Sequence, residues 1–277
     1  MTNIGVIGHG FVGKAVEYGF SPKNKVFVYD KYQETLPVNE VVENSEFIFI
    51  CVPTPMSADY AKIDLSIIYE ATGEVVRIAK EKNLNPIIVL KSTIVPGTTE
   101  KLREKYEYDN ILFNPEFLTE ANYLDDFVNT DRIVIGGHNE EAMEKLAKLY
   151  KDSLPPTAIF LTNPTAAEMV KYMANTYLAS KVMFANEMAE MCEKLNIDYG
   201  KVKEMVVADK RIYDSHLDVT DNKGFGGKCF PKDTVALLGR AKEIGADMTV
   251  LNTVWKKNLK IRKVHDWEEI PGAVSAK

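Results

Sequence analysis

Several features common in membrane and secreted proteins are missing from this sequence. It has no run of the ~18 apolar residues that a membrane-spanning helix requires. Its first residues show no basic segment followed by an apolar run and a cleavage site, so we expect no signal peptide. Its 3 cysteines, Cys51, Cys192 and Cys229, are far apart and odd in number, which is typical of reduced thiols. We therefore predict a cytoplasmic protein without membrane contact.

Residues that would bind metals or nucleic acids are also scarce. The 4 histidines are scattered and no cysteine or histidine cluster has zinc spacing, so we predict no metal site. The net charge of −6 argues against a nucleic-acid partner. What remains is the composition of an ordinary globular protein, 277 residues with 45% hydrophobic and 27% charged, which is enough for two domains.

A glycine-rich turn lies near the N-terminus. Residues 3–7 are typical of a buried strand and run into Gly8-His9-Gly10-Phe11-Val12-Gly13, which opens a helical pattern. In a dinucleotide-binding turn the first glycine forms the turn, the second admits the pyrophosphate and the third packs helix on strand. The next strand, 25–29, ends at Asp30, and a carboxylate there binds a ribose 2′-hydroxyl and repels a 2′-phosphate. The pattern predicts NAD rather than NADP; the alternative is a surface turn followed by a solvated aspartate.

Strand and helix patterns alternate to about residue 161. Further strands are predicted over 46–51, 86–90, 111–113 and 132–135, with a helix over 65–82. Alternation of this kind is typical of a doubly wound parallel sheet. We therefore predict an α/β fold whose N-terminal part, residues 1–162, is a Rossmann-like NAD-binding domain.

Three of the predicted strands end in motifs that can bind a ligand, because open α/β sheets bind ligands at the carboxyl ends of their strands. The motifs are the proline-stiffened Cys51–Pro55, the hydroxyl-rich Ser92–Thr99, and Asn114–Glu120 with two carboxylates. The hydroxyls are equally suited to cap a helix starting near Thr98. Glu116 and Glu120 are suited to acid/base chemistry or to a helix N-terminus. The sequence leaves both choices open.

A long helical pattern over 165–194 follows Asn163-Pro164. Its apolar side chains cover most faces, so it needs other elements or a second subunit around it. Glu168, Lys171 and Asn175 share one face, where a lysine is costly to bury unless it meets an anion or has its pKa tuned for catalysis. Shorter helical patterns cover 199–208, 233–244 and 248–263. We predict an all-helical central domain over 163–263 and a frayed tail over 264–277.

The loop Gly224-Phe225-Gly226-Gly227-Lys228-Cys229-Phe230-Pro231-Lys232-Asp233 indicates chemistry most directly. Its glycines let the backbone approach a ligand closely. Pro231 predicts that Cys229 lies just before a helix N-terminus, where the helix dipole and the neighbouring lysines favour a thiolate. A nucleophilic cysteine is therefore favoured over one that only packs.

In their order along the chain, these motifs resemble those of the UDP-glucose 6-dehydrogenases and of the related enzymes that act on GDP-mannose and UDP-N-acetyl-hexosamines. The resemblance covers residues 3 to about 262. It rests on Gly8-x-Gly10-x-x-Gly13 with Asp30, Cys51–Pro55, Ser92–Gly97, Asn114–Leu118 with Glu120, Asn175–Ala179 with Asn186-Glu187, and Gly224–Asp233. It implies an oxidation of CH₂OH to COO⁻ by two NAD⁺ without release of the aldehyde.

The resemblance also implies roles for individual residues. Catalytic roles fall to the nucleophile Cys229, to Lys171 and Asn175 at oxyanions, to Asp233 and Thr93 at a water, and to Glu120 as general base. Cofactor contacts fall to Gly8, Gly10, Phe11, Val12, Gly13, Asp30, Pro53, Thr54, Thr93 and Glu120. Substrate contacts fall to Glu116, Phe117, Leu118, Lys171, Asn175, Arg211, Phe225, Gly226 and Gly227. The long helix is implied to form a homodimer in which Arg211 reaches the partner's site.

Members of this family usually continue into a third domain that binds UDP. This sequence shows no such domain. The resemblance therefore implies that another chain completes the site, that the site is more open, or that the substrate differs. Two other functions are compatible with the motifs: a two-electron β-hydroxyacid dehydrogenase and an NAD-binding dimer without catalysis. The first has no need for Cys229, and the second has no reason to keep Lys171, Asn175, Cys229 and Asp233.

Overall fold

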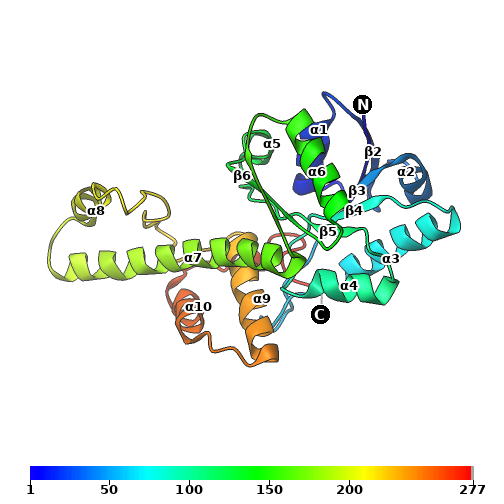
Figure 1. Ribbon diagram of the computed structural model, residues 1–277. Coiled ribbons are helices and arrows are strands. Elements are labelled where there is room, and N and C mark those ends of the chain that lie inside the picture. Colours follow the sequence, from blue (N-terminus) through cyan, green and yellow to red (C-terminus); the bar gives the residue numbers. More distant parts are fainter. Residues whose placement is uncertain (276–277) are drawn as a thin grey trace. The chain divides into compact units, whose positions relative to one another are not determined.

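The computed structural model describes residues 1–275, and the chain divides into two compact units (Figure 1). Unit 1 comprises Met1–Thr54 and Asp64–Lys171, and unit 2 comprises Pro55–Ile63 and the chain from Tyr172 onward. These units differ from the predicted domains at two places. Unit 1 extends beyond residue 162 to Lys171, and Pro55–Ile63 leaves it to join unit 2.

Unit 1 is built on a 7-stranded sheet with the order β2-β1-β3-β4-β5-β6-β7. The strands are β1 (Asn3–Ile7), β2 (Lys25–Tyr29), β3 (Phe47–Ile50), β4 (Ile87–Leu90), β5 (Ile111–Phe113), β6 (Arg132–Gly136) and β7 (Ala158–Thr162). Neighbouring strands from β2 to β5 are parallel, so the predicted α/β fold with a Rossmann-like sheet is confirmed.

The predicted parallel sheet is interrupted at one place, because β6 pairs antiparallel to β5 through Phe113 and Gly136. β7 then runs parallel to β6. An antiparallel neighbour begins at the edge where the preceding strand ends, so no crossover is needed. The segment from Asn114 to Asp131 therefore stays at the carboxyl edge of β5, together with the Asn114–Glu120 motif.

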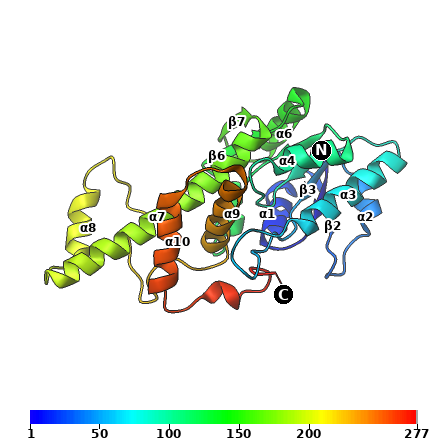
Figure 2. The same cartoon turned by 90° about the horizontal axis from the view of Figure 1, so that it is seen from below.

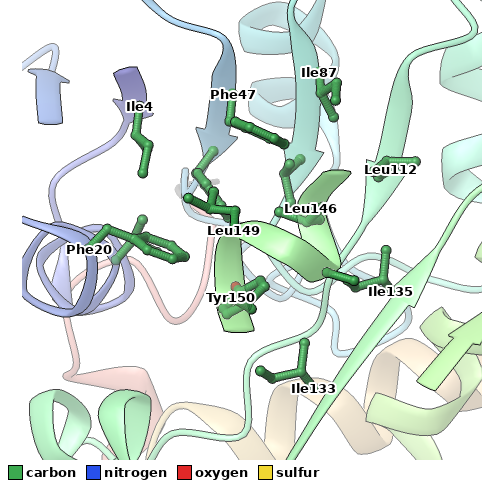
Figure 3. Packing of buried hydrophobic residues seen from close by; sticks show 14 of the residues in the cluster. Ile4, Phe20, Phe47, Ile87, Leu112, Ile133, Ile135, Leu146, Leu149 and Tyr150 are labelled. Carbon is green, nitrogen blue, oxygen red and sulfur yellow. The ribbon is translucent and has the colours of Figure 1, made fainter. Parts of the chain in front are cut away.

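Helices cover both faces of the sheet. They are α1 (Phe11–Phe20), α2 (Val38–Asn44), α3 (Ser66–Glu81), α4 (Thr98–Tyr106), α5 (Tyr123–Val128) and α6 (Glu140–Ser153). Residues of α1, α5 and α6 share one apolar cluster with the strands, and residues of α2, α3 and α4 share the other. Figure 3 shows Leu146 and Leu149 of α6 facing Phe47 and Ile87 of the sheet. Full burial of such a side chain contributes roughly 1.5–3 kcal/mol, so these clusters hold the strand ends in place.

Of the two segments of unit 2, the longer one, which begins at Tyr172, is mainly helical. Its helices are the remainder of α7 (Pro164–Lys194), then α8 (Tyr199–Val207), α9 (Cys229–Ile244) and α10 (Thr249–Ile261), with the 3-10 turn η1 (Asp266–Glu268). The predicted long helix is confirmed as the 31-residue α7. Figure 2 shows α9 and α10 beside α7, and α8 near its C-terminal end. Apolar side chains of α7, α9 and α10 form one cluster around Trp255 and Trp267.

The prediction of a frayed tail is wrong for residues 264–275, the part of it that the structure describes. Trp267 is fully buried, and its ring packs 5.7 Å from that of Trp255. Met56 donates a backbone hydrogen bond to Ala273 at 2.8 Å, and Ser275 donates one to Met56 at 2.7 Å. Because these partners come from distant parts of the chain, local composition did not reveal the ordered segment. Lys277 and its neighbour Ala276 lie outside the described residues.

Candidate active site

The glycine-rich turn adopts the geometry that its pattern predicted. Gly8 has a φ of +91°, a backbone conformation that residues with a side chain rarely adopt. A Cβ on Gly13 would lie 2.0 Å from the carbonyl oxygen of Gly8, so only glycine fits there. Gly10 precedes α1 and supplies no side-chain cap, and a Cβ on it would meet nothing within 4 Å. The first amides of α1, in Phe11 to Gly13, belong to a helix N-terminus, where an anion can be bound.

Asp30 follows β2 and lies beside this turn. Its Oδ2 accepts a 2.7 Å hydrogen bond from the amide of His9, and its Oδ1 accepts one of 2.8 Å from the amide of Tyr32. The imidazole of His9 lies 2.7 Å from the Glu17 carboxylate. The carboxylate of Asp30 is therefore held in a fixed orientation at the end of β2, which suits recognition of a ribose diol.

The loops after β3 and β4 are joined by hydroxyl groups. The Thr54 hydroxyl donates to the carbonyl of Thr93 at 2.9 Å, and the Ser92 hydroxyl donates to that of Val52 at 2.7 Å. Thr54 and Thr93 are buried, whereas Pro53 is exposed. These bonds fix Pro53, Thr54 and Thr93 at the carboxyl edge of the sheet.

The helix that begins at Thr98 is capped by a residue of another helix and not by the hydroxyls of its own loop. Gly97, and no side chain of the loop, occupies the N-cap position of α4. The buried carboxylate of Glu168 accepts hydrogen bonds from the amides of Gly97 (2.5 Å) and Thr99 (2.8 Å) and from the Thr99 hydroxyl (2.6 Å). Burial raises the pKa of Glu168 to about 7, although these hydrogen bonds act in the opposite direction. Glu168 therefore caps α4.

Glu116 and Lys171 form a buried ion pair, with 2.8 Å between Oε1 and Nζ and side chains only 5% and 3% exposed. The second oxygen of Glu116 accepts a hydrogen bond from the amide of Leu118 at 2.7 Å. The ring of Phe117 lies 3.9 Å from the Arg132 guanidinium and 5.8 Å from the Lys171 ammonium. The expected anion for Lys171 is thus supplied by Glu116, while Glu120 is exposed.

Sequence reasoning missed Lys91, which immediately follows β4 and is buried. Its ammonium donates to Asn114 Oδ1 at 2.8 Å and to the carbonyl of Pro115 at 3.3 Å, and the Tyr150 hydroxyl donates to the same Asn114 oxygen at 2.5 Å. Burial lowers the pKa of Lys91 to about 8. A lysine directly after an apolar strand was the available signal. Lys91 holds the loop that carries Glu116.

In unit 2, Asp233 receives hydrogen bonds from Asn175, a predicted site residue, and from its neighbour Lys232. Asn175 Nδ2 donates to its Oδ2 at 2.6 Å, and Lys232 Nζ donates to its Oδ1 at 2.5 Å. Asp233 is buried in the second turn of α9. Asn175 and Asp233, 58 positions apart in the sequence, are thus brought together as a polar pair.

Cys229 is the first residue of α9, one step later than predicted, and it is half-buried. The other thiols are poor nucleophiles by comparison: Cys192 is buried, and burial raises the pKa of Cys51 to about 12. The amides of Gly224 and Phe225 donate to Asn186 (3.1 Å) and Asn258 (2.8 Å).

The remaining predicted positions vary in exposure. Phe225 is buried and Gly226 and Gly227 are half-buried, whereas the Arg211 side chain is 89% exposed and paired with Asp209.

Among residues 1–275, no three His, Cys, Asp or Glu side chains gather closely enough to hold a metal ion. In the same part of the chain, no helix combines the length and apolar character needed to cross a bilayer. The predicted residues thus fall into two groups, one in each unit.

Two family models match the chain. The NAD-binding domain of the UDP-glucose/GDP-mannose dehydrogenase family matches residues 24–154, and the central domain of the same family matches residues 165–260. The predictions of the family and of an NAD-binding domain are therefore confirmed.

Individual proteins give the same result. A UDP-glucose 6-dehydrogenase of Rickettsia bellii is 38% identical over 235 residues, 83% of this chain and 53% of that protein. The chain thus spans about half the length of this curated relative. The structure of a UDP-glucose dehydrogenase from Pyrobaculum islandicum matches with a TM-score of 0.86 and 32% identity, over 94% of this chain and 68% of that one. A 3-hydroxyisobutyrate dehydrogenase of Mycobacterium tuberculosis matches with a TM-score of 0.72 over 94% and 93% of the two chains, but at 16% identity this shows a shared fold alone.

Proposed function

Because the chain belongs to the UDP-glucose/GDP-mannose dehydrogenase family, we propose that it is an NAD-dependent dehydrogenase that oxidises the C6 hydroxymethyl group of a nucleotide sugar. UDP-glucose, after which the similar enzymes of Rickettsia bellii and Pyrobaculum islandicum are named, is the first choice. The observation that carries this proposal is the presence, in one chain, of a nucleotide-binding turn and of a half-buried cysteine at a helix N-terminus.

The residues at the carboxyl edge of unit 1 fit NAD. The open space at Gly10 and the uncapped start of α1 suit the pyrophosphate, and Asp30 suits a ribose diol. Pro53, Thr54 and Thr93 line the neighbouring strand ends. NAD supplies the hydride acceptor.

The proposed reaction is balanced as R–CH₂OH + 2 NAD⁺ + H₂O → R–COO⁻ + 2 NADH + 3 H⁺. A hydride first leaves C6 while the C6 hydroxyl loses its proton, which gives an aldehyde. The Cys229 thiolate adds to that aldehyde, so that a hydride remains on carbon in the thiohemiacetal. Loss of this hydride gives a thioester, which water hydrolyses to the carboxylate while the thiolate leaves.

The polar side chains divide the remaining work. Lys171 and Asn175, one turn apart on α7, stabilise the oxyanions that form at C6. Glu116 fixes the Lys171 ammonium through its 2.8 Å ion pair, and Asp233 is held by Asn175 in the same way. Asp233 and Thr93 orient water, and Glu120 accepts its proton during hydrolysis. Phe117, Leu118, Phe225, Gly226 and Gly227 contact the sugar.

We also propose that the protein is a homodimer through α7. Met173, Tyr177, Phe184, Met188 and Met191 of α7 are exposed, as is Leu195 directly after it, and the spacing of the helical residues places them within a single stripe. A stripe of this kind on one long helix can pair with itself about a two-fold axis. The exposed Arg211 then reaches the partner's substrate.

Replacement of the nucleophile tests the function. With NAD⁺ and a panel of nucleotide sugars, the wild-type protein is expected to form two NADH per molecule of acid. Cys229→Ala is expected to form no acid, while its affinity for NAD⁺ stays unchanged, because the nucleotide is bound by other residues.

The stoichiometry separates the rival functions. One NADH per product, with Cys229→Ala still active, would indicate a two-electron dehydrogenase. Binding of NAD⁺ without turnover of any sugar in the panel would indicate a non-catalytic protein. Cys192→Ala, which removes a buried thiol elsewhere in unit 2, is the matched control and is expected to retain activity.

A further inference from the structure

The segment from Arg262 to Ser275 lies against the cysteine loop of unit 2. It begins just after the residues that the family's central-domain model matches, which end at 260. Its side chains bind the loop backbone on the N-terminal side of Cys229, at Lys223, Gly224 and Gly227. None of these side chains has a place in the chemistry described above.

Arg262 binds the start of the loop from the end of α10. Its Nη1 donates to the carbonyl of Lys223 at 3.0 Å and lies 3.4 Å from that of Gly224. Its Nη2 donates to Asp266 Oδ2 at 3.1 Å. The Arg262 side chain is only 9% exposed, whereas that of Asp266 is 37% exposed, and the guanidinium joins the loop carbonyls to Asp266 through charge-assisted hydrogen bonds.

Asp266 binds the loop two residues before Cys229. Its Oδ2 accepts a 3.1 Å hydrogen bond from the amide of Gly227, a glycine with a φ of +72°. Its Oδ1 is buried and has no hydrogen-bond partner among the described residues. A Cβ on Gly226 would lie 2.2 Å from both this oxygen and Arg262 Nη2. The loop backbone therefore rests directly on the Arg262–Asp266 pair.

Both sides of Asp266 are anchored in unit 2. Trp267 is fully buried beside Trp255, and His265 stacks on its ring at 4.7 Å. Further along, Ala273 and Ser275 share backbone hydrogen bonds with Met56. Because Asp266 is fixed by its neighbours, its bond to Gly227 restricts the loop rather than following it.

We propose that Arg262 and Asp266 are positioning residues that hold the Gly224–Cys229 backbone so that the Cys229 thiol stays in its half-buried, productive place at the start of α9. This role rests on the proposed function of Cys229 as the nucleophile. The loop contains three glycines, and its Phe225 ring packs in the apolar cluster of unit 2, 6.1 Å from that of Trp255. The loop amides at 224, 225 and 227 also donate to Asn186, Asn258 and Asp266, from three separate elements.

The test compares Asp266→Ala, which removes the acceptor, with Asp266→Asn, which keeps an amide oxygen that can accept from Gly227. Asp247→Ala is the matched control, because among residues 1–275 the Asp247 side chain accepts hydrogen bonds only from Thr249, at the start of α10. The readout is alkylation of Cys229 by iodoacetamide, followed by mass spectrometry of the Cys229 peptide. NADH formation and NAD⁺ affinity are measured in parallel.

Asp266→Ala is expected to raise the Cys229 alkylation rate about tenfold, since a released loop exposes the thiol more often. It is expected to lower kcat by a similar factor and to leave NAD⁺ affinity unchanged. Asp266→Asn is expected to have an alkylation rate and a kcat within about threefold of wild type. Asp247→Ala is expected to match wild type in both quantities. A loss of fold alone would not raise alkylation and keep NAD⁺ bound at the same time.

An alkylation rate for Asp266→Ala within twofold of wild type would overturn the proposal. Should that variant not fold, amide hydrogen exchange on the wild-type protein decides: slow exchange over 224–228 supports the proposal, and exchange as fast as in a free peptide refutes it. Neither measurement needs a sugar substrate. If alkylation and hydrogen exchange give the expected results but the protein oxidises no nucleotide sugar, the proposed function is refuted and the positioning role stands.

Discussion

Two glycines of the nucleotide-binding turn have different physical reasons for lacking a side chain. At Gly13 a Cβ would collide with the carbonyl of Gly8, so the reason lies within the protein. At Gly10 the backbone has a φ of −74° and a Cβ would meet nothing within 4 Å, so the protein itself has no need of glycine there. The space at Gly10 is therefore open to a ligand.

Gly10→Ala is accordingly expected to leave the melting temperature within about 2 °C of wild type and to weaken NAD⁺ binding at least about tenfold, because the methyl group occupies the pyrophosphate position. Calorimetric titration with NAD⁺ and thermal unfolding measure the two quantities. Gly13→Ala serves as the contrast and is expected to lower the melting temperature itself. Unchanged NAD⁺ affinity in Gly10→Ala would show that the pyrophosphate does not lie against this residue.

The Glu116–Lys171 pair allows a second prediction at the scale of single residues. Removal of one member leaves the other charge buried, so Lys171→Met is expected to lower the free energy of unfolding by roughly 3–5 kcal/mol. Glu116→Gln combined with Lys171→Met is expected to recover at least half of that loss, since no charge then remains unpaired. Denaturant titration of both variants measures the difference.

Lys145→Met is a suitable control, because its ion pair with Glu141 is exposed and contributes little. If the double variant were as unstable as Lys171→Met, the cost would come from lost packing rather than from the unpaired carboxylate.

The same residues mark the limit of what the sequence could predict. The spacing of Glu168, Lys171 and Asn175 correctly indicated one polar face and an anion for Lys171. It could not indicate which partner each side chain meets, because these partners lie far away in the sequence, in a loop after β5, at the start of α4 and in α9. Lys171 meets Glu116, while Glu168 turns to α4 and Asn175 to Asp233.

At the scale of elements, Glu168 joins α7 to the N-terminus of α4 through a carboxyl group whose pKa burial raises to about 7 from a usual 4.5. The folded protein therefore retains a proton on Glu168 that the unfolded chain loses between these two pH values. The stabilisation is fully present below pH 4.5 and is lost as the pH rises to about 7, a change on the order of 3 kcal/mol.

Glu168→Gln removes this ionisation. The free energy of unfolding of Glu168→Gln minus that of wild type is expected to increase as the pH rises from 4.5 to 7.5. Above pH 7.5 this difference is expected to stay constant. Glu100, in the first turn of α4, provides a control of opposite sign, because hydrogen bonds from His138 and Arg103 outweigh burial and lower its pKa. A pH-independent difference for Glu168→Gln would mean that Glu168 is ionised in the folded protein throughout.

Elements were predicted well where their signal is local and poorly where it is not. The strand ends and the glycine turns followed from runs of apolar residues and from breakers. The direction of β6 and the order of the segment 264–275 did not, because each depends on a distant partner: Gly136 on Phe113, and Trp267 on Trp255.

At the scale of the whole molecule, the stripe of exposed apolar side chains on α7 is the main feature that one chain alone leaves unexplained. Large exposed apolar surfaces are typical of interfaces. Phe184, at the middle of the stripe and 58% exposed, is suited to be a central contact. Its replacement by a charged residue would bury that charge in a dimer interface but not in a monomer.

Phe184→Glu is therefore expected to raise the dissociation constant of the proposed dimer at least about 30-fold. Light scattering coupled to size-exclusion chromatography, run over a range of protein concentrations, is expected to give the mass of one chain where wild type gives that of two. Tyr32→Glu, at an aromatic position of unit 1 that is 88% exposed, is expected to leave the wild-type mass unchanged. A wild-type protein with the mass of one chain at all concentrations would refute the dimer, and a Phe184→Glu variant that keeps the mass of two would place its interface away from this stripe.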